Sequence, residues 1–328
     1  TLKSVKGIGW YIEEYGIAQL SLNLTDITVT PVHIAFDEAC NKAQSRGIRV
    51  TGSELVGLLP LRVLLDAADH YLRKQQRSLG ISEAEKVKIA VKSLGLDDLA
   101  PFDPSKRVIE YVIAEEGKSA LVNMTLNQFA DTTASEAPAP GGGSISAYAG
   151  ALGAALATMV ANLSAHKRGW DDRWEEFSVH AERGLALQNQ LMALVDADTQ
   201  AFDAIMSAYG MPKGSNDQKA KRHQAIQAAT RNAIDIPMQV AQLAHDGLSL
   251  AAAMSSDGNP NSVTDAGVGA MCLRTAVLGA VLNARINCGD LEDTDYVAQI
   301  QSRCAELVES ATGQELDILA TVDRVLAG

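Results

Sequence analysis

The chain is poor in aromatic side chains, in cysteine and in positive charge, and each shortage excludes a class of protein. Aromatic residues make up 5% of the 328 positions while alanine is abundant, which predicts at least one core of closely packed helices with small side chains. The 28 Lys and Arg face 40 Asp and Glu, and this net charge of -12 argues against nucleic acid as a partner. The four cysteines form no Cys-x-x-Cys pair, so we expect reduced thiols in a cytoplasmic protein.

Metal-ligand spacings and long apolar runs are also missing. The histidines are scattered with no His-x-x-x-His spacing, so we expect no metal ion. The Ala- and Gly-rich run near 145–163 holds too many Gly, Ser and Thr for a membrane span, so we expect no membrane partner. The chain opens at Thr1 directly into a strand-like segment, which suggests that a further segment precedes it.

The length predicts two domains, and residues 1–116 are expected to form a small α+β sandwich with one helical layer. Strict alternation of apolar and polar residues indicates a strand over Ala18–Thr25. Two further strands are expected, at Trp10–Glu14 before a turn at Tyr15-Gly16, and at Ile48–Thr51.

The helices of this first domain are marked at their first residues. Thr30-Pro31 is expected to cap one helix, and Pro60 begins another. Ser82 followed by Glu85 indicates a capping box for a short helix through Val91.

After a linker at 117–124, residues 125–328 show helical period and no alternating strands, which predicts an all-α antiparallel helix bundle. One of its helices, rich in Ala, Gly, Ser and Leu, lets neighbours or a second copy of the chain approach closely. Pro237 is expected to kink or interrupt the third helix. The expected helices are Ser144–Ala165, Asp172–Tyr209, Asp217–Asp246, Val263–Asn287 and Thr294–Ala327.

A run of three glycines, Gly141, Gly142 and Gly143, leads into a helix that Ser144 can cap. Exposed N–H groups at a helix start bind anions such as a carboxylate, although the Lys-Ser/Thr ending of a P-loop is missing. The alternative is a flexible linker. The adjoining helix is suited to tight packing, which makes a disordered tether less natural.

Asp198 is the best candidate for acid–base chemistry. It follows Val195 by three residues and precedes Phe202 by four, which places it on the apolar stripe that continues to Met206. An inward-facing aspartate in apolar surroundings has a raised pKa and can give or take a proton. The alternative is an aspartate that faces solvent or pairs with Lys or Arg.

Two other polar clusters have both a structural and a functional interpretation. The loop that carries Asn259, Asn261 and Asp265 can be explained by structure alone, as a turn followed by an N-cap. In a functional interpretation, its amide and carboxylate groups would bind the donor and acceptor edges of a heterocycle. Lys167 and Arg168 form a basic patch that either meets an acidic substrate tail or is a solvated helix end favoured by the helix dipole.

Several blocks resemble a known family. Those similar to the C-terminal subdomain of glutamate formiminotransferase are Gly7–Glu14, Val50–Pro60 and the stretch from Leu94 to Phe102. Those similar to formiminotetrahydrofolate cyclodeaminase are Ala139–Ser144, Val195–Asp198, and Gly258-Asn259 with Asp265. The blocks span the chain in the order found in the bifunctional formiminotransferase-cyclodeaminase family.

This resemblance implies a cyclodeaminase that converts 5-formiminotetrahydrofolate to 5,10-methenyltetrahydrofolate and ammonia, in histidine degradation and one-carbon metabolism. It further implies a homodimer or larger homo-oligomer that takes polyglutamylated tetrahydrofolate as substrate. The family's catalytic acid lies in the Asp-Ala-Asp block and falls on Asp198. The transferase half of the family takes its catalytic histidine from an N-terminal subdomain, so no such role passes to His33, and no formimidoyltransferase activity is expected from this chain alone.

The implied reaction needs only proton transfer and proximity. The N10 amine attacks the formimino carbon, and the intermediate loses ammonia once that nitrogen is protonated, so one acid–base group suffices without metal or organic cofactor. The anionic glutamate tail gives Gly141–Ser144 and Lys167-Arg168 a role as substrate-binding groups. Two alternatives stay open: a methenyltetrahydrofolate cyclohydrolase, and a non-catalytic folate-binding or assembly module.

Overall fold

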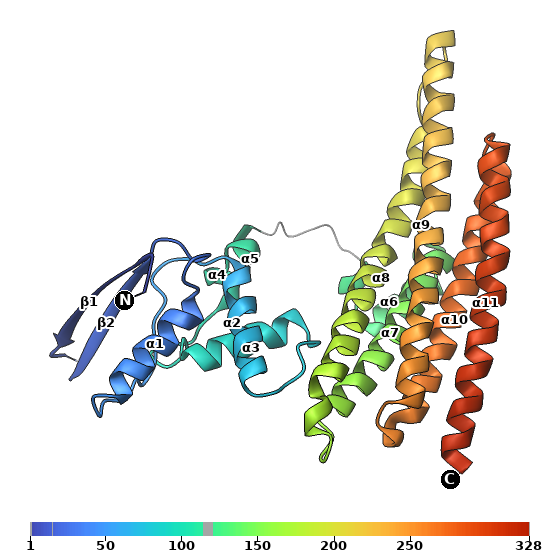
Figure 1. Cartoon of the computed structure of the whole chain (residues 1–328). Coiled ribbons are helices and arrows are strands. Elements are labelled where there is room, and N and C mark those ends of the chain that lie inside the picture. Colours follow the sequence, from blue (N-terminus) through green and yellow to red (C-terminus); the bar gives the residue numbers. More distant parts are fainter. Residues whose placement is uncertain (1, 15, 114–120, 328) are drawn as a thin grey trace. The chain divides into compact units, whose positions relative to one another are not determined.

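The computed structural model describes residues 2–14, 16–113 and 121–327, and the chain divides into two compact units, residues 1–116 and 117–328 (Figure 1). Each unit has its own hydrophobic core. The expected linker at 117–124 lies mostly outside the described residues. Its last part, Leu121–Asn123, is a 3-10 helix (η1) whose first residue packs into the core of the second unit.

The first unit begins with an antiparallel hairpin of β1 (Val5–Ile12) and β2 (Ile17–Leu24). Tyr15 of the expected turn lies outside the described residues, whereas Gly16 adopts φ +63°, the left-handed conformation that glycine tolerates. The first strand runs earlier than expected, because its pairing with β2 starts at Val5 and ends at Ile12.

Three principal helices form the core of the first unit. Proline precedes the first residue of α1 and of α2, but the Thr30 hydroxyl donates to Lys3 O at 2.6 Å and does not cap α1 as expected. The Ser82 hydroxyl caps α3 by accepting from the Glu85 N–H at 3.3 Å, as predicted. Two short helices close the unit. The bounds are α1 Val32–Gln44, α2 Leu61–Lys74, α3 Glu83–Leu94, α4 Pro104–Arg107 and α5 Ile109–Ile113.

The expected strand at Ile48–Thr51 is wrong, since this segment is irregular. A strand exists only where a neighbour completes its hydrogen bonds, and among the described residues β1 and β2 pair with each other alone. The chain beyond Thr51 instead bonds to helix ends: Ser53 N–H donates to Gly95 O at 2.9 Å.

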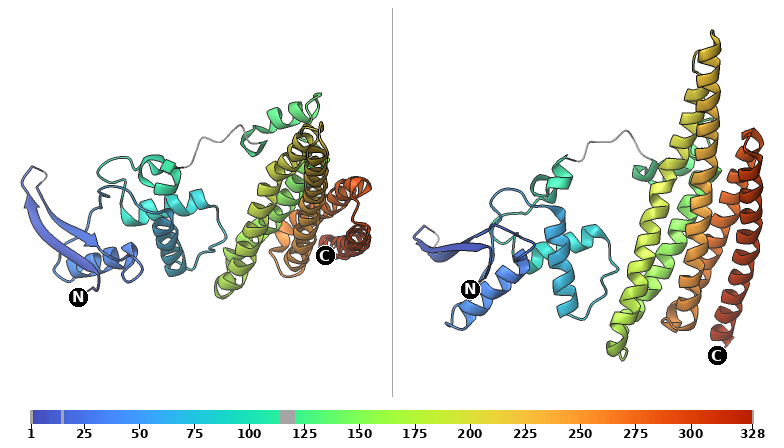
Figure 2. Two further views of the ribbon diagram at one scale, coloured as in Figure 1. Left: turned by 90° about the horizontal axis from the view of Figure 1, so that it is seen from above. Right: turned by 45° about the horizontal axis from the view of Figure 1, so that its top comes forward.

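The second unit is an antiparallel helix bundle, so the predicted fold class of a small α+β unit followed by an all-α unit is confirmed. The hairpin formed by α8 and α9 projects beyond the other long helices (Figures 1 and 2). The helices are α6 Leu126–Thr133, α7 Gly142–Ala165, α8 Trp174–Tyr209, α9 Asn216–Ser256, α10 Val263–Asn287 and α11 Thr294–Ala327. Single 3-10 turns connect some of them: η2 Asp171–Arg173, η3 Pro260–Ser262 and η4 Cys288–Asp290.

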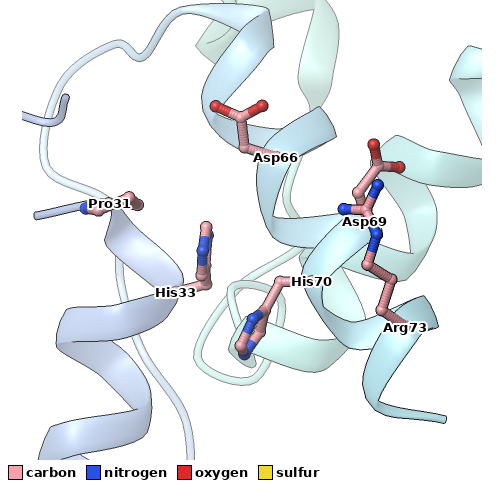
Figure 3. A pocket seen from close by; sticks show the side chains of 6 residues that line it. All are labelled: Pro31, His33, Asp66, Asp69, His70 and Arg73. Carbon is pink, nitrogen blue, oxygen red and sulfur yellow. The ribbon is translucent and has the colours of Figure 1, made fainter.

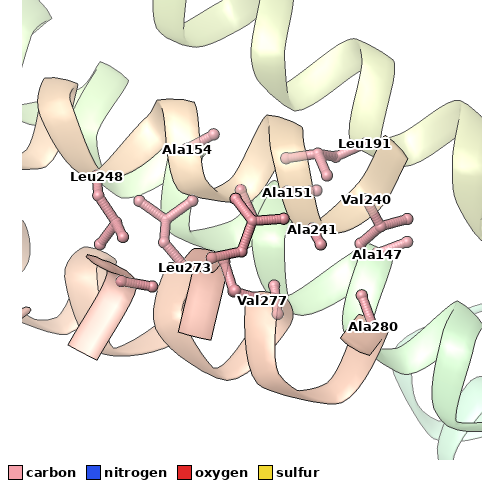
Figure 4. Packing of buried hydrophobic residues seen from close by; sticks show 14 of the residues in the cluster. Ala147, Ala151, Ala154, Leu191, Val240, Ala241, Leu248, Leu273, Val277 and Ala280 are labelled. Carbon is pink, nitrogen blue, oxygen red and sulfur yellow. The ribbon is translucent and has the colours of Figure 1, made fainter. Parts of the chain in front are cut away.

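Small side chains allow the bundle helices to approach closely, as the composition predicted. A Cβ on Gly153 of α7 would lie 2.7 Å from the carbonyl oxygen of Gly269 on α10, so the two backbones are nearly in contact there. Around this crossing alanines alternate with larger side chains such as Leu191 and Leu273 (Figure 4). The core is therefore filled by interdigitation rather than by aromatic bulk.

Helix α9 runs continuously from Asn216 to Ser256, so the prediction that Pro237 interrupts it is wrong. Proline has no N–H for the carbonyl four residues earlier, which is that of Ala233. The Asn287 Nδ2 of α10 donates to this Ala233 oxygen at 2.9 Å and replaces the missing partner. A side chain from a neighbouring helix thus compensates for the proline in the interior of α9.

Contrary to the expectation from the sequence, two helical segments within residues 2–14, 16–113 and 121–327 are long and apolar enough to cross a membrane. They are Gly142–Ala165 and Pro260–Asp290, and 61% and 50% of their most apolar windows are buried inside the bundle. About half or more of each apolar window is therefore used in contacts between helices.

Candidate active site

The Asp198 carboxyl group lies over the first turn of α7. Helices α7 and α8 run antiparallel, which brings the middle of α8 beside the start of α7. The Ser144 N–H donates to Asp198 Oδ2 at 3.0 Å. The Ser144 hydroxyl can donate either to the same oxygen, at 3.3 Å, or to Val195 O, at 2.9 Å. A helix N-terminus offers free N–H groups and a positive dipole end, so it holds and orients this carboxyl group.

Gly143 makes this placement possible. A Cβ at this position would overlap the Asp198 carboxyl group, whereas a Cβ on Gly141 would have no atom within 4 Å. Glycine is therefore needed at Gly143 for space and not for backbone conformation. The triglycine run is an ordered helix start, which excludes the flexible-linker interpretation for Gly142 and Gly143.

Burial raises the pKa of Asp198, and the two hydrogen bonds from Ser144 oppose this rise without cancelling it. A carboxyl group with a raised pKa exchanges protons more readily near neutral pH than an exposed aspartate does. The nearby Asp196 has a different task, because its Oδ1 accepts from the Leu121 N–H at 2.7 Å and fixes the start of the second unit.

The periodicity that singled out Asp198 holds only in part. Val195 is 1% exposed, as an inward stripe requires, but Phe202 and Met206 are 43% and 56% exposed. Both follow Asp198 in α8, toward the C-terminal end of this helix. Ala201 and Ala208 continue the buried side of α8 instead, at 3% and 5% exposure, and Asp198 lies half-buried beside it.

Sequence reasoning missed Asn283, which reaches this site from α10. A Cβ on Gly142 would lie 3.1 Å from Asn283 Nδ2, which places the amide against the first turn of α7. The only sequence signal is a lone amide inside the apolar run from Ala280 to Ala284.

The remaining predicted site residues lie at the opposite end of α7. Lys167 and Arg168 follow its last residue, and the Asn259 N–H donates to Ser164 Oγ at 2.7 Å. At about 1.5 Å per residue, the helix separates the two ends by roughly 35 Å. One chain therefore does not bring these residues together with Asp198.

At that far end the side chains make local contacts. Lys167 Nζ lies 3.8 Å from the centre of the Trp170 ring, and Asn259 Oδ1 accepts from the Asn261 N–H at 3.2 Å, so this asparagine caps η3. Asp265 lies in the first turn of α10. The structural interpretation of the loop as a turn with an N-cap therefore holds.

The first unit contains a separate pocket of about 320 Å³ (Figure 3). His33 stacks on His70 with 4.5 Å between ring centres, and His70 Nε2 lies 3.1 Å from Asp37 Oδ2. Burial, followed by the neighbouring His70, lowers the pKa of His33. Stacked rings do not direct two nitrogens at one ion, and no group of three or more His, Cys, Asp or Glu that could hold a metal occurs among the described residues. The pocket is lined by Pro31, His33, Asp66, Asp69, His70 and Arg73.

Two family models match this chain. Residues 125–306 match the model described as formiminotransferase-cyclodeaminase, and residues 1–114 match the formiminotransferase domain. The chain is 36% identical over 323 residues to formimidoyltransferase-cyclodeaminase of Rattus norvegicus, an alignment that covers 98% of this chain and 60% of that protein. It thus spans 60% of the length of this relative.

Two further proteins resemble the second unit. Methenyltetrahydrofolate cyclohydrolase of Methylorubrum extorquens is 34% identical over 200 residues, covering 61% of this chain and 96% of that protein. The crystal structure of formiminotetrahydrofolate cyclodeaminase from Thermotoga maritima superposes with a TM-score of 0.55 at 25% identity, covering 62% of this chain and 98% of the other.

Proposed function

This chain belongs to the formiminotransferase-cyclodeaminase family, and we propose accordingly that its second unit is a formimidoyltetrahydrofolate cyclodeaminase. The proposed reaction converts 5-formiminotetrahydrofolate to 5,10-methenyltetrahydrofolate and ammonia. The observation that carries the proposal is the position of the half-buried Asp198 carboxyl group, which Ser144 holds at the start of α7. The carboxyl group fits there because Gly143 has no Cβ to overlap it.

Asp198 would move one proton between two nitrogens of the substrate. In the amidinium form of the formimino group, the N10 amine attacks the carbon and becomes positively charged. Asp198 takes the N10 proton and passes it to the former formimino nitrogen, which leaves as ammonia with the electron pair of the C–N bond. The atoms balance without a further reactant, and such proton transfer contributes about 10²–10⁴-fold in rate.

We propose a homodimer or larger homo-oligomer in which a second copy covers the outer faces of α7 and α10. Helix α7 carries no charged residue, and Leu152 on α7 and Met271 on α10 are 45% and 44% exposed. The same exposed stripes contain Ile145, Met159, Leu163, Val268 and Leu282. An apolar surface on two packed helices is the surface that an obligate partner covers.

The second copy also gives the far-end residues a role. In one chain a substrate would have to span the length of α7, roughly 35 Å, to reach from Asp198 to Lys167 and Arg168. A partner whose α7 runs antiparallel to this one brings its own basic patch near Asp198. Under this proposal Gly141–Ser144 bind one end of the substrate, and Lys167, Arg168, Asn259, Asn261 and Asp265 of a second copy approach the other.

The test is ammonia release from 5-formiminotetrahydrofolate by the purified full chain and by Asp198→Asn. We expect the variant to lose about 10²–10⁴-fold in kcat, because the amide cannot carry a proton. Asp203→Asn is the matched control, since this exposed aspartate lies five residues further along α8. Wild-type turnover in Asp198→Asn would remove this residue from the mechanism.

The second candidate function is hydrolysis of methenyltetrahydrofolate, favoured by the similarity to the Methylorubrum enzyme over 96% of that protein. The transferase-like first unit favours the cyclodeaminase instead. Rates of ammonia release and of methenyltetrahydrofolate hydrolysis, measured on the same preparation, decide between them. Folate binding without either reaction would support the non-catalytic module.

Transfer of the formimino group to or from glutamate is a separate question, because residues 1–114 match the formiminotransferase domain. The expectation that this chain alone does not catalyse transfer stays a prediction, and a glutamate-dependent assay tests it.

A cytoplasmic location, a role in histidine degradation and catalysis without a cofactor are proposed with the cyclodeaminase function. Activity that survives exhaustive chelation and dialysis supports the last of these.

A further inference from the structure

Asn283 and Asp198 approach the first turn of α7 from two different helices. A Cβ on Gly142 would lie 3.1 Å from Asn283 Nδ2 and 3.6 Å from Asn283 Oδ1, and a Cβ on Gly143 would overlap the Asp198 carboxyl group. Gly142 and Gly143 are consecutive, so the amide and the carboxyl group contact neighbouring residues of the first turn of α7. Three helices, α7, α8 and α10, place them there.

The contacts of Asn283 determine which way its amide faces. Nδ2 donates to Gly279 O at 2.8 Å, and since a carbonyl only accepts, this bond identifies the nitrogen end of the side chain. The Oδ1 atom therefore faces away from Gly279. In the described ranges 2–14, 16–113 and 121–327 no group donates a hydrogen bond to it. Oδ1 is not among the buried atoms that lack a partner, so solvent reaches it, and a ligand N–H can take the place of that water.

We propose that Asn283 Oδ1 binds the formimino nitrogen and selects a nitrogen leaving group over an oxygen one. This proposal rests on the cyclodeaminase function proposed above. The formimino nitrogen carries N–H groups both in the amidinium reactant and in the protonated intermediate that releases ammonia. The oxygen of a 5-formyl group carries no hydrogen and cannot donate to Oδ1. A bound 5-formyl compound would therefore place its own oxygen against Asn283 Oδ1, and both atoms are acceptors. Sites built around such a hydrogen bond discriminate strongly against the analogue that lacks it.

The experiment compares three variants of the full chain. Asn283→Leu keeps the volume and removes the acceptor, and Asn283→Asp keeps an acceptor. Thr275→Val is the control, because Thr275 lies on the same helix and its hydroxyl likewise donates to the carbonyl four residues earlier, with Oγ1 2.8 Å from Met271 O. Each is assayed for ammonia release and for its binding preference for 5-formimino- over 5-formyltetrahydrofolate.

We expect Asn283→Leu to lower kcat/KM for ammonia release by about 10- to 100-fold and to reduce the binding preference by a similar factor. Thr275→Val should match the wild type. Asn283→Asp should recover most of the rate, with the acid limb of its pH profile at higher pH, because a second carboxylate raises the pKa of Asp198.

An Asn283→Leu variant with an unchanged binding preference would overturn the proposal, and so would an Asn283→Asp variant no better than Asn283→Leu, which indicates a structural role. If the wild type releases no ammonia, the cyclodeaminase function fails. The ligand preference, measured by binding alone, still tests Asn283 in that case.

Discussion

Gly143 and Asp198 share one space: the hydrogen atom of the glycine occupies the side of the helix on which the carboxyl group rests. A methyl group at this position would displace the carboxyl group from the N–H of Ser144. We expect Gly143→Ala to lower ammonia release to about the level of Asp198→Asn, with the helical content preserved. Gly313→Ala on α11, whose methyl group would meet no atom within 4 Å, is the control and should keep wild-type activity.

The pH dependence of the reaction should follow Asp198. The carboxylate must be free to take the N10 proton, so kcat/KM falls as the pH drops through the pKa of Asp198. Because burial raises this pKa above the ordinary 3.8, the fall should begin at higher pH than for an exposed aspartate. Steady-state rates across an acidic to neutral pH series measure the position of this limb.

Ser144→Ala should shift that limb further toward neutral pH, because the Ser144 hydroxyl lowers the pKa of Asp198 and its removal lets the pKa rise. Ser146→Ala is the control, since the Ser146 hydroxyl donates to Gly142 O at 2.6 Å and does not bond to Asp198. An acid limb that stays in place in Ser144→Ala would show that another group titrates.

The hydrogen bond from Asn287 to Ala233 should be needed for a stable α9. Asn287→Leu leaves the Ala233 carbonyl without a partner beside Pro237, at a cost of about 1–3 kcal/mol in the free energy of unfolding. Urea denaturation measures this change. The double variant Asn287→Leu, Pro237→Ala should recover part of the loss, because an alanine in place of the proline supplies the missing backbone N–H.

The outer faces of α7 and α10 should hold two copies together. Leu152→Glu and Met271→Glu place a charge in the proposed interface, so light scattering coupled to size exclusion should show a fall in molar mass to that of a single chain. Leu316→Glu is the control, because Leu316 on α11 is 61% exposed and lies outside these two faces. Unchanged molar mass in both interface variants would place the contact between copies elsewhere.

Local signals were sufficient for most of the helices. The bounds Val263–Asn287 and Thr294–Ala327 agree with the structure, and the Ser82 cap and the proline-led helix starts lie where the sequence placed them. These features depend on residues within one or two turns of each other, and an argument from caps and periodicity uses such neighbours directly. The strand expected at Ile48–Thr51 failed because a strand depends on a partner that no local pattern names.

The order of residues along the chain was enough to predict an α+β unit followed by a helical bundle, and to single out Asp198 on its helix. The groups that surround Asp198 became known only from the packed helices: Ser144 and Gly143 from α7 and Asn283 from α10 lie beside it, while Lys167 and Asn259 lie at the other end of α7. The antiparallel packing of α7 and α8 sets this division, since it joins the start of one helix to the middle of the other. Periodicity states which face of a helix is inward, and only packing between helices states what that face meets.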